Sequence, residues 1–181
     1  MSLIKPFSGI RPKKKFAKEV TSPNVSYIDN YKPNKKLNFL NLLNTSKINK
    51  SKKILKSLKD KGIIQQDTSN HFYLYRITYN KKKLLGIVGK INLDNYDDKK
   101  ILGHEETFVE RIKKRKEQLL KFNSQISPIY TTYKSTPNSL KKLKNIFRFK
   151  SDYNFRSKDK CRHELWVVNK LNKVRLLKNY L

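Results

Sequence analysis

The stretch Leu102–Arg111, LGHEETFVER, places an imidazole beside carboxylates in a chain that is otherwise strongly basic. His104 and Glu105 are adjacent, and Glu106 and Glu110 follow closely, although the whole sequence holds only 14 Asp and Glu against 43 Lys and Arg. An imidazole next to a carboxylate can transfer a proton or orient a hydroxyl nucleophile. The stretch is therefore the first candidate for a functional site.

Part of this stretch also has a purely structural interpretation. Thr107 followed by Glu110 fits the capping box, in which the two residues exchange side-chain to backbone hydrogen bonds at a helix N-terminus. Glu105 and Glu106 would lie just before the positive end of the helix dipole, where a carboxylate stabilises the helix by about 0.3–1 kcal/mol. The cap does not need His104 or Glu105, so the site interpretation applies best to these two residues.

Other site chemistries lack their sequence patterns. HEETF is not the zinc motif H-E-x-x-H, because Phe108 stands where the second histidine is needed. His71 and His163 stand alone on expected strands, so we predict no metal site. Neither G-x-x-x-x-G-K-[ST] nor G-x-G-x-x-G occurs, and a total of 5 Gly does not favour a backbone phosphate cradle. Cys161 is the sole cysteine and is more typical of a small core residue than of a nucleophile.

The elements that must position the candidate site begin with a helix and a hairpin. The spacing of apolar residues predicts a helix over 46–61, and Gly62 fits the left-handed position that ends a helix. Residues 71–79, HFYLYRITY, and 84–91, LLGIVGKI, are typical of strands. The link of residues 80–83 is short enough for a turn, so we expect an antiparallel hairpin.

The second half of the sequence continues this mixture. Residues 108–122 predict a helix with an inward apolar face formed by Val109, Ile112, Leu119 and Leu120. The later elements are two strands and two helices, expected at residues 127–133, 161–168, 139–146 and 169–181. Helices combined with a hairpin favour an α+β fold with a mixed, largely antiparallel sheet and flanking helices. The length of 181 residues favours a single domain over 1–181.

The net charge of +29 raises the question of a nucleic acid partner, because such a field attracts phosphates at long range. Yet only 8 of the 43 basic residues are arginine, the better bidentate ligand for phosphate and guanine. Lysine pairs are scattered from end to end rather than gathered on one helix or tail. This pattern also fits a compositional bias, so we expect nucleic acid binding that is weak and non-specific.

Cysteine usage and hydropathy restrict the cellular compartment of the chain. The single Cys161 fits a reducing compartment, and the N-terminus lacks the apolar segment of a signal peptide. No stretch approaches the 18 or so apolar residues that a membrane-spanning helix requires. We therefore predict a cytoplasmic protein with no membrane partner.

Five segments match a known pattern when they are taken together. They are IKPFSGIRP with AKEVTSP, LKSLKDKGIIQQD with FYLYRITY, GHEET, NSQISPIYTTY and RHELWVV. This set resembles the N-terminal half of the family named domain of unknown function 1015, which is related to the ParB-like free-L-serine kinases. The family's His-Glu-x-Thr motif falls on His104, Glu105 and Thr107, with Arg111 downstream. Its Asn-x-Gln-x-x-Pro segment includes Gln125.

The resemblance implies a function, and it also shows that two of the family's motifs do not occur in this sequence. It implies phosphoryl transfer onto a small hydroxyl metabolite such as free serine, with His104, Glu105, Arg111 and Gln125 facing one cleft. The family's Pro-Tyr-Asp-Val is replaced by Asn24-Val25-Ser26-Tyr27, and its later phosphate-handling motif, Asp-Gly-His-His-Arg, does not occur before Leu181. We therefore expect a truncated or partial relative that is catalytically incomplete alone.

The missing motif also decides which cofactors and partners the resemblance implies. No cofactor is expected in this chain, and ATP or ADP with Mg would bind only if a separately encoded C-terminal half were supplied. The alternative function is a non-enzymatic, basic nucleic-acid-binding module, in which the lysine-rich surface would contact phosphates.

Overall fold

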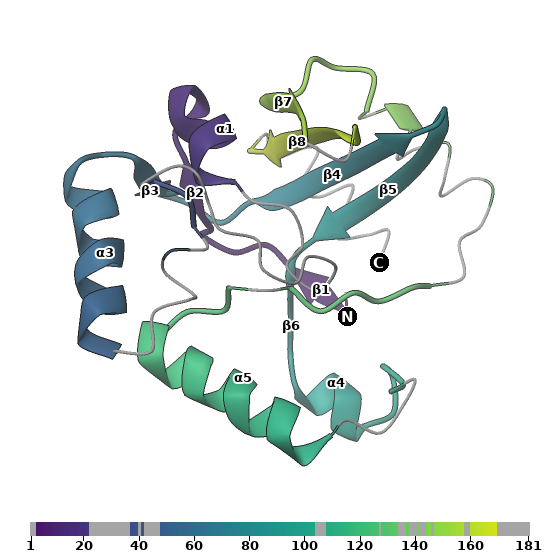
Figure 1. Ribbon diagram of the computed structural model, residues 1–181. Helices are drawn as coiled ribbons and strands as arrows, with labels where there is room; N and C mark the ends of the chain where they lie inside the picture. The colour runs from purple at the N-terminus through teal and green to yellow at the C-terminus, as the bar shows by residue number, and fades with distance from the viewer. Residues whose placement is uncertain are drawn as a thin grey trace.

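A computed structural model describes residues 3–21, 37–39, 41, 48–103, 108–126, 128–133, 137, 141, 144–145, 147–157 and 160–169. The elements in chain order are β1 (Ile4–Lys5), β2 (Ile10–Pro12), the 3₁₀ helix η1 (Lys14–Phe16), α1 (Ala17–Val20), α3 (Ile48–Asp60), β3 (Ile64–Gln66), β4 (Phe72–Tyr79), β5 (Lys82–Val88), β6 (Lys90–Ile91), α4 (Asp94–Asp97), α5 (Val109–Phe122), β7 (Tyr153–Arg156) and β8 (Arg162–Val168). Helices and antiparallel strands are combined in the predicted α+β arrangement (Figure 1).

The largest sheet has four antiparallel strands in the order β5-β4-β8-β7. The predicted hairpin is its β4–β5 edge, and the pairing of Tyr79 with Lys82 leaves only two residues in the turn. These residues, Asn80 and Lys81, have φ values of 45° and 65°, as a tight two-residue hairpin turn requires. The turn is therefore shorter than the four residues expected from the sequence.

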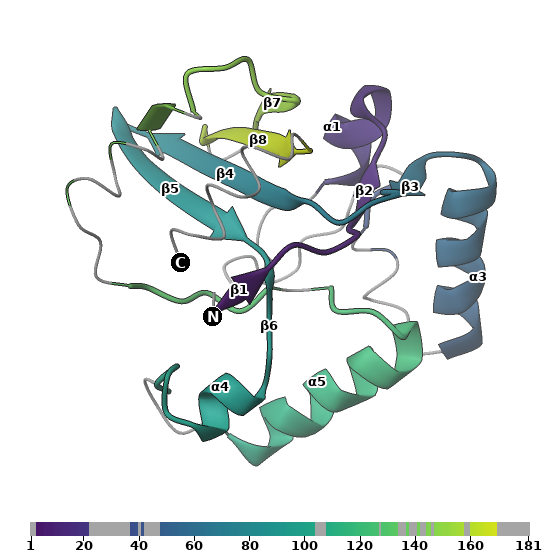
Figure 2. The ribbon, with the colours of Figure 1, turned by 180° about the vertical axis from the view of Figure 1, so that it is seen from behind.

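Short strand pairs join the N-terminal segment to the rest of the molecule. β1 pairs with β6, and β2 pairs with β3, both antiparallel. An isolated bridge between Phe7 and His71 continues the connection toward β4. Seen from both sides, β2 lies beside β3, and α3 and α5 lie apart from the four-stranded sheet (Figures 1 and 2).

The apolar core lies on one face of the four-stranded sheet. Side chains of β4 and β8 alternate between the two faces, which places Phe72, Leu74, Trp166 and Val168 together on this side. Phe147 packs against them, with its ring edge-on to Trp166 at a centroid distance of 5.0 Å. We call this the core face. Its residues are at most 6% exposed, so it holds the sheet rigid.

A second apolar cluster packs α1, α3 and α5 against β3. It consists of Val20, Leu58, Ile63, Ile64 and Phe122. The turn after α3 delivers two of these residues, because Gly62 adopts a φ of 60° and lets the chain reverse. The amide of Gly62 donates to the Lys59 carbonyl at 2.8 Å, and the amide of Ile63 donates to the Leu58 carbonyl at 2.9 Å. The predicted glycine at the end of this helix is confirmed.

The predicted inward face of the 108–122 helix is wrong. Its apolar residues lie at the surface, with exposed fractions of 81% for Val109, 54% for Ile112, 47% for Leu119 and 71% for Leu120. α5 meets the second cluster only through its C-terminal end, where Phe122 is buried. Helical spacing of apolar residues thus predicted the helix but not its packing, because no described element covers this side of it.

A further expectation needs correction, and another is not tested. α5 begins at Val109 with Phe108 as its N-cap residue, and Thr107, on which the predicted capping box depends, lies outside the described residues. Residues 128–133 are not a strand, and Ile129 and Tyr130 are 76% and 71% exposed. A strand needs a partner for its backbone, and no described strand pairs with this segment.

The C-terminal elements are described only in part. The strand predicted at 161–168 is confirmed as β8, and β7 beside it was not predicted. Within 139–146 the described residues 141, 144 and 145 are helical, and the last predicted helix lies outside the described residues apart from position 169. Among the described helices, none is long and apolar enough to cross a membrane.

Candidate functional site

The four residues predicted for the site are not all placed by the structure. His104 and Glu105 lie outside the described residues. Arg111 is in the first turn of α5, and Gln125 follows the end of that helix. At 1.5 Å of rise per residue, Arg111 and the last residue of α5 are about 17 Å apart along the axis. Arg111 thus lies near the start of α5, and Gln125 lies three residues beyond its end.

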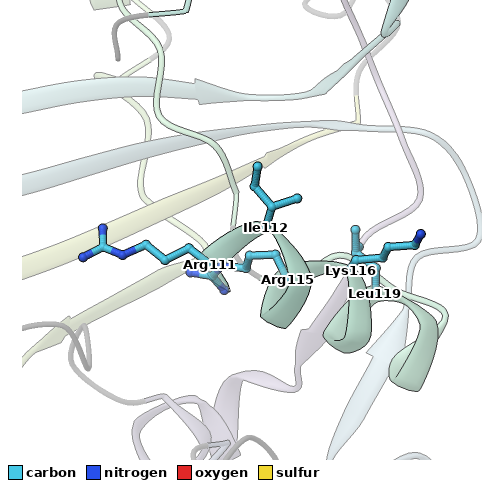
Figure 3. A pocket seen from close by; sticks show the side chains of 5 residues that line it. All are labelled: Arg111, Ile112, Arg115, Lys116 and Leu119. Atoms are coloured by element: carbon cyan, nitrogen blue, oxygen red, sulfur yellow. The ribbon is translucent and has the colours of Figure 1, made fainter. Parts of the chain in front are cut away.

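Arg111 lines a groove on the surface of α5. The groove has a volume of about 420 Å³, and its lining residues are Arg111, Ile112, Arg115, Lys116 and Leu119. Figure 3 shows these side chains fanning out from successive turns of the same helix. The Arg111 guanidinium lies 5.3 Å from the Phe108 ring centroid, and Arg115 donates to Gln118 at 3.1 Å. The groove combines positive charge with apolar side chains.

A more ordered arrangement lies on the sheet, opposite the core face. The register places Tyr75 of β4, Gly86 of β5, Phe155 of β7 and His163 of β8 on this side, which we call the open face. Gly86 is exposed, and the three ring-bearing residues are half-buried. The same face also carries Tyr73 and Tyr153, which are buried, so it is only partly exposed to solvent.

Both ring nitrogens of His163 have hydroxyl partners on the open face. Tyr75 Oη lies 2.6 Å from Nδ1, and Ser157 Oγ lies 2.6 Å from Nε2. Ser157 Oγ also donates to the Cys161 carbonyl at 3.0 Å. Since that bond uses the serine proton, Nε2–H donates to Ser157. The imidazole thus links two hydroxyl groups, an arrangement that can relay a proton.

The sequence alone offered little indication of this relay. The segment RHELWVV included His163, but the histidine was expected to stand alone on its strand. Ser157 comes from the link between β7 and β8, and Tyr75 comes from β4, 88 residues away from His163. The diagonal contact across two strands depends on their register, which the spacing of residues within one strand does not show.

A second polar centre closes one end of the open face. Arg11 donates from Nε to both carboxylate oxygens of Asp67, at 2.9 and 3.0 Å. Tyr73 donates to the same carboxylate at 2.6 Å, and the Gly9 amide donates to Tyr73 Oη at 2.8 Å. Arg11 Nη1 also donates to Tyr153 Oη at 2.5 Å. This network ties β2 to β4 and β7.

The network perturbs the titration of its members. Burial by itself raises the pKa of Asp67, but hydrogen bonds from Arg11 and Tyr73 outweigh it and hold the pKa below its usual value. Burial, followed by the bond to Asp67, raises the pKa of Tyr73. Asp67 is therefore ionised and Tyr73 neutral near pH 7, so this centre is suited to holding the fold together.

A second ion pair lies on the core face of the sheet. Arg76 donates to the two carboxylate oxygens of Glu164 at 2.6 and 2.7 Å, and its guanidinium lies 5.0 Å from the Trp166 ring centroid. The hydrogen bond from Arg76 lowers the pKa of Glu164. The described part of the chain contains no group of three or more His, Cys, Asp or Glu that could hold a metal ion.

Comparison with known proteins gave one match. A family model described as a protein of unknown function, DUF1015, matches residues 4–181. No curated protein and no solved structure matched the sequence.

Proposed function

The chain belongs to the DUF1015 family, and from that premise we propose that it is a partial relative of the ParB-like free-serine kinases. It holds a small hydroxyl metabolite, such as free serine, but does not complete phosphoryl transfer alone. In this proposal His104 and Glu105 accept and direct the hydroxyl proton, because their adjacent imidazole and carboxylate suit that chemistry. Arg111 and Gln125 are the further family positions assigned to the site.

The observation that carries this proposal is the exposure of the described Lys and Arg side chains and the neutralisation of those that are not exposed. Every described Lys and Arg side chain is exposed except those of Arg11, Arg76 and Lys121. Arg11 and Arg76 are each neutralised by a carboxylate, Asp67 and Glu164. Lys121 lies 5.3 Å from the Phe122 ring centroid at the end of α5.

Phosphoryl transfer depends on charges held in position around the moving phosphate. The exposed lysines are screened by water. Two of them, Lys14 and Lys100, also form surface ion pairs with Asp152 and Asp98. The described residues therefore fit a protein that needs a phosphate-binding region supplied from elsewhere. The nucleotide, ATP or ADP with Mg, would bind to that region.

Calorimetric titration with free L-serine tests the acceptor part of the proposal. We expect saturable binding by the purified chain and a loss of affinity of tenfold or more in Glu105→Gln and His104→Ala. Glu106→Gln is the matched control, because it removes a neighbouring carboxylate outside the family motif, and it should bind as the wild type does. Equal losses in all three variants, or no binding by the wild type, would contradict the proposal.

The surface of α5 favours a second candidate, a non-enzymatic nucleic-acid-binding module. This helix exposes Arg111, Lys113, Arg115 and Lys116 within two turns. Such a surface would bind nucleic acid weakly, without regard to sequence, and with an affinity that falls steeply as salt is added. Affinity that survives about 0.2 M salt, or strong discrimination between sequences, would indicate a dedicated specific site instead.

A further inference from the structure

β5 is the long free edge of the four-stranded sheet. It pairs with β4 on one side only, and among the described residues it makes no backbone hydrogen bond outside that pairing. Figures 1 and 2 show it along one margin of the sheet, beside β4. The opposite edge is the four-residue strand β7, whereas β5 has seven residues in unbroken register with β4. A free edge of this length is a template for one more strand.

The hairpin turn determines which backbone groups of β5 point outward. A two-residue turn is closed by a pair that exchanges both hydrogen bonds, and this pair is Tyr79 and Lys82. Because such pairs alternate along an antiparallel ladder, every second residue after Lys82 also directs its N–H and C=O groups toward β4. The residues in between, Lys83, Leu85 and Ile87, direct theirs away from the sheet. The free edge therefore offers the donors and acceptors of these three residues.

The same edge of a second copy fits these groups. When two β5 strands pair antiparallel about a twofold axis over their whole length, Leu85 of one copy lies opposite Leu85 of the other, because it is the middle residue of the strand. In this register Lys83 of each copy lies opposite Ile87 of the other. Every outward N–H then meets an outward C=O. Other registers that join outward groups pair fewer residues.

The side chains of β5 are compatible with this register. Leu84 of each copy, which is 51% exposed, lies opposite Gly86 of the other. It has room there, because a Cβ atom built on Gly86 would meet nothing within 4 Å among the described residues. Leu85 is half-buried against the core face, and across the axis it meets the same residue of the second copy. The pairing thus extends the apolar core face from one copy to the other.

Charge is the main force against association of two copies, because each carries +29. The register keeps the strand lysines apart. Lys83 of one copy lies four residues along the strands from Lys83 of the other, about 14 Å, which exceeds the screening length of about 8 Å at physiological salt. Added salt should therefore strengthen the association of two copies, whereas it weakens the binding of nucleic acid or of an acidic protein.

We propose that the chain forms a twofold-symmetric dimer in which β5 pairs with β5 of a second copy, so that the two four-stranded sheets become one continuous sheet. This pairing is independent of serine and nucleic acid binding. One pair of strands buries an area at the lower end of specific interfaces, so the dissociation constant should be roughly micromolar.

Sedimentation equilibrium of the full chain measures the association. Leu85→Pro removes an outward N–H and leaves the hydrogen bonds to β4 in place, as proline on an edge strand does. Leu85→Ala is the matched control, because it shortens the side chain and keeps the N–H. We expect dimers of the wild type, an association constant lower by about tenfold or more in Leu85→Pro, and a much smaller loss in Leu85→Ala. The wild type should associate more strongly in about 0.5 M salt than in about 0.05 M.

Disulfide trapping tests the same register without a change to the backbone. In a Cys161→Ser background, Leu85→Cys places two thiols on directly opposite residues, whose Cα atoms would be about 5.5 Å apart and within disulfide range. Lys82→Cys is the control, because its two copies would lie six residues apart along the strands, about 20 Å. We expect oxidation to give a covalent dimer with Leu85→Cys and little with Lys82→Cys. A monomeric wild type, equal association of Leu85→Pro and wild type, or equal crosslinking of the two cysteine variants would each overturn the proposal.

Discussion

The guanidinium of Arg11 makes three short contacts with the carboxylate of Asp67. Two come from Nε, at 2.9 and 3.0 Å, and one comes from Nη2, at 2.6 Å. The two residues are 56 positions apart in the sequence, and their side chains are 22% and 6% exposed. The pair fixes β2 against the residue that follows β3. It also closes one end of the open face.

Removing this carboxylate should destabilise the fold. Asp67→Ala leaves Arg11 and Tyr73 without their shared acceptor, and we expect a loss of about 2–3 kcal/mol in the free energy of unfolding. Urea denaturation measures the loss. Lys14→Ala is the control, because its ion pair with Asp152 is 3.4 Å long and exposed, so it should cost less than about 1 kcal/mol. Similar losses in the two variants would contradict this account.

Stability should fall in acid partly because of the two sheet carboxylates. Asp67 and Glu164 have lowered pKa values in the folded state. Each therefore stabilises the fold fully above its unfolded pKa, near 4, and loses that contribution as the pH falls through its folded pKa. Melting temperatures recorded from pH 6 to pH 2 should decline less steeply in the double variant Asp67→Asn, Glu164→Gln. An unchanged slope would show that other groups dominate.

Gly62 and Gly86 should respond oppositely to replacement by alanine. Gly62→Ala forces a side chain into a φ of 60° and should cost about 1 kcal/mol. Gly86→Ala adds a Cβ in open space on a strand and should be neutral or slightly stabilising. Thermal unfolding of both variants compares them directly. A cost at Gly86 equal to that at Gly62 would mean that the space over Gly86 is filled.

Two leucines distinguish the packed face from the uncovered one. Leu74 is 0% exposed within the core face, so Leu74→Ala should cost about 2–5 kcal/mol. Leu120 on α5 is 71% exposed, and its change to alanine should alter stability by less than about 0.5 kcal/mol. Chemical denaturation of the two variants is the measurement. A large cost at Leu120 would show that this face of α5 is covered after all.

The sequence predicted those elements whose signals are local. The hairpin and β8 were found because aromatic and branched residues cluster in β4, β5 and β8. Gly62 was found because the end of a helix needs a left-handed residue that glycine adopts at no steric cost. In contrast, β7 has only four residues, YNFR, and becomes a strand through its pairing with β8.

The features that sequence reasoning missed depend on contacts between distant segments. The side chains of Asp67 and Arg11 meet because β2 pairs with β3, and His163 meets Tyr75 through the register of β8 on β4. The apolar spacing of α5 indicates a helix but does not identify what lies against each side. His104 and Glu105 were assigned to a site through the family's His-Glu-x-Thr motif, and their roles stay a prediction.

The measurement that tests the central claim most directly is formation of phosphoserine by the purified chain. The chain is incubated with free serine, Mg and either ATP or ADP, alone and with the C-terminal half of a full-length family member that carries Asp-Gly-His-His-Arg. We predict no turnover by the chain alone, turnover in the mixture, and its loss when the chain carries Glu105→Gln. Turnover by the chain alone, or none in the mixture, would contradict the account.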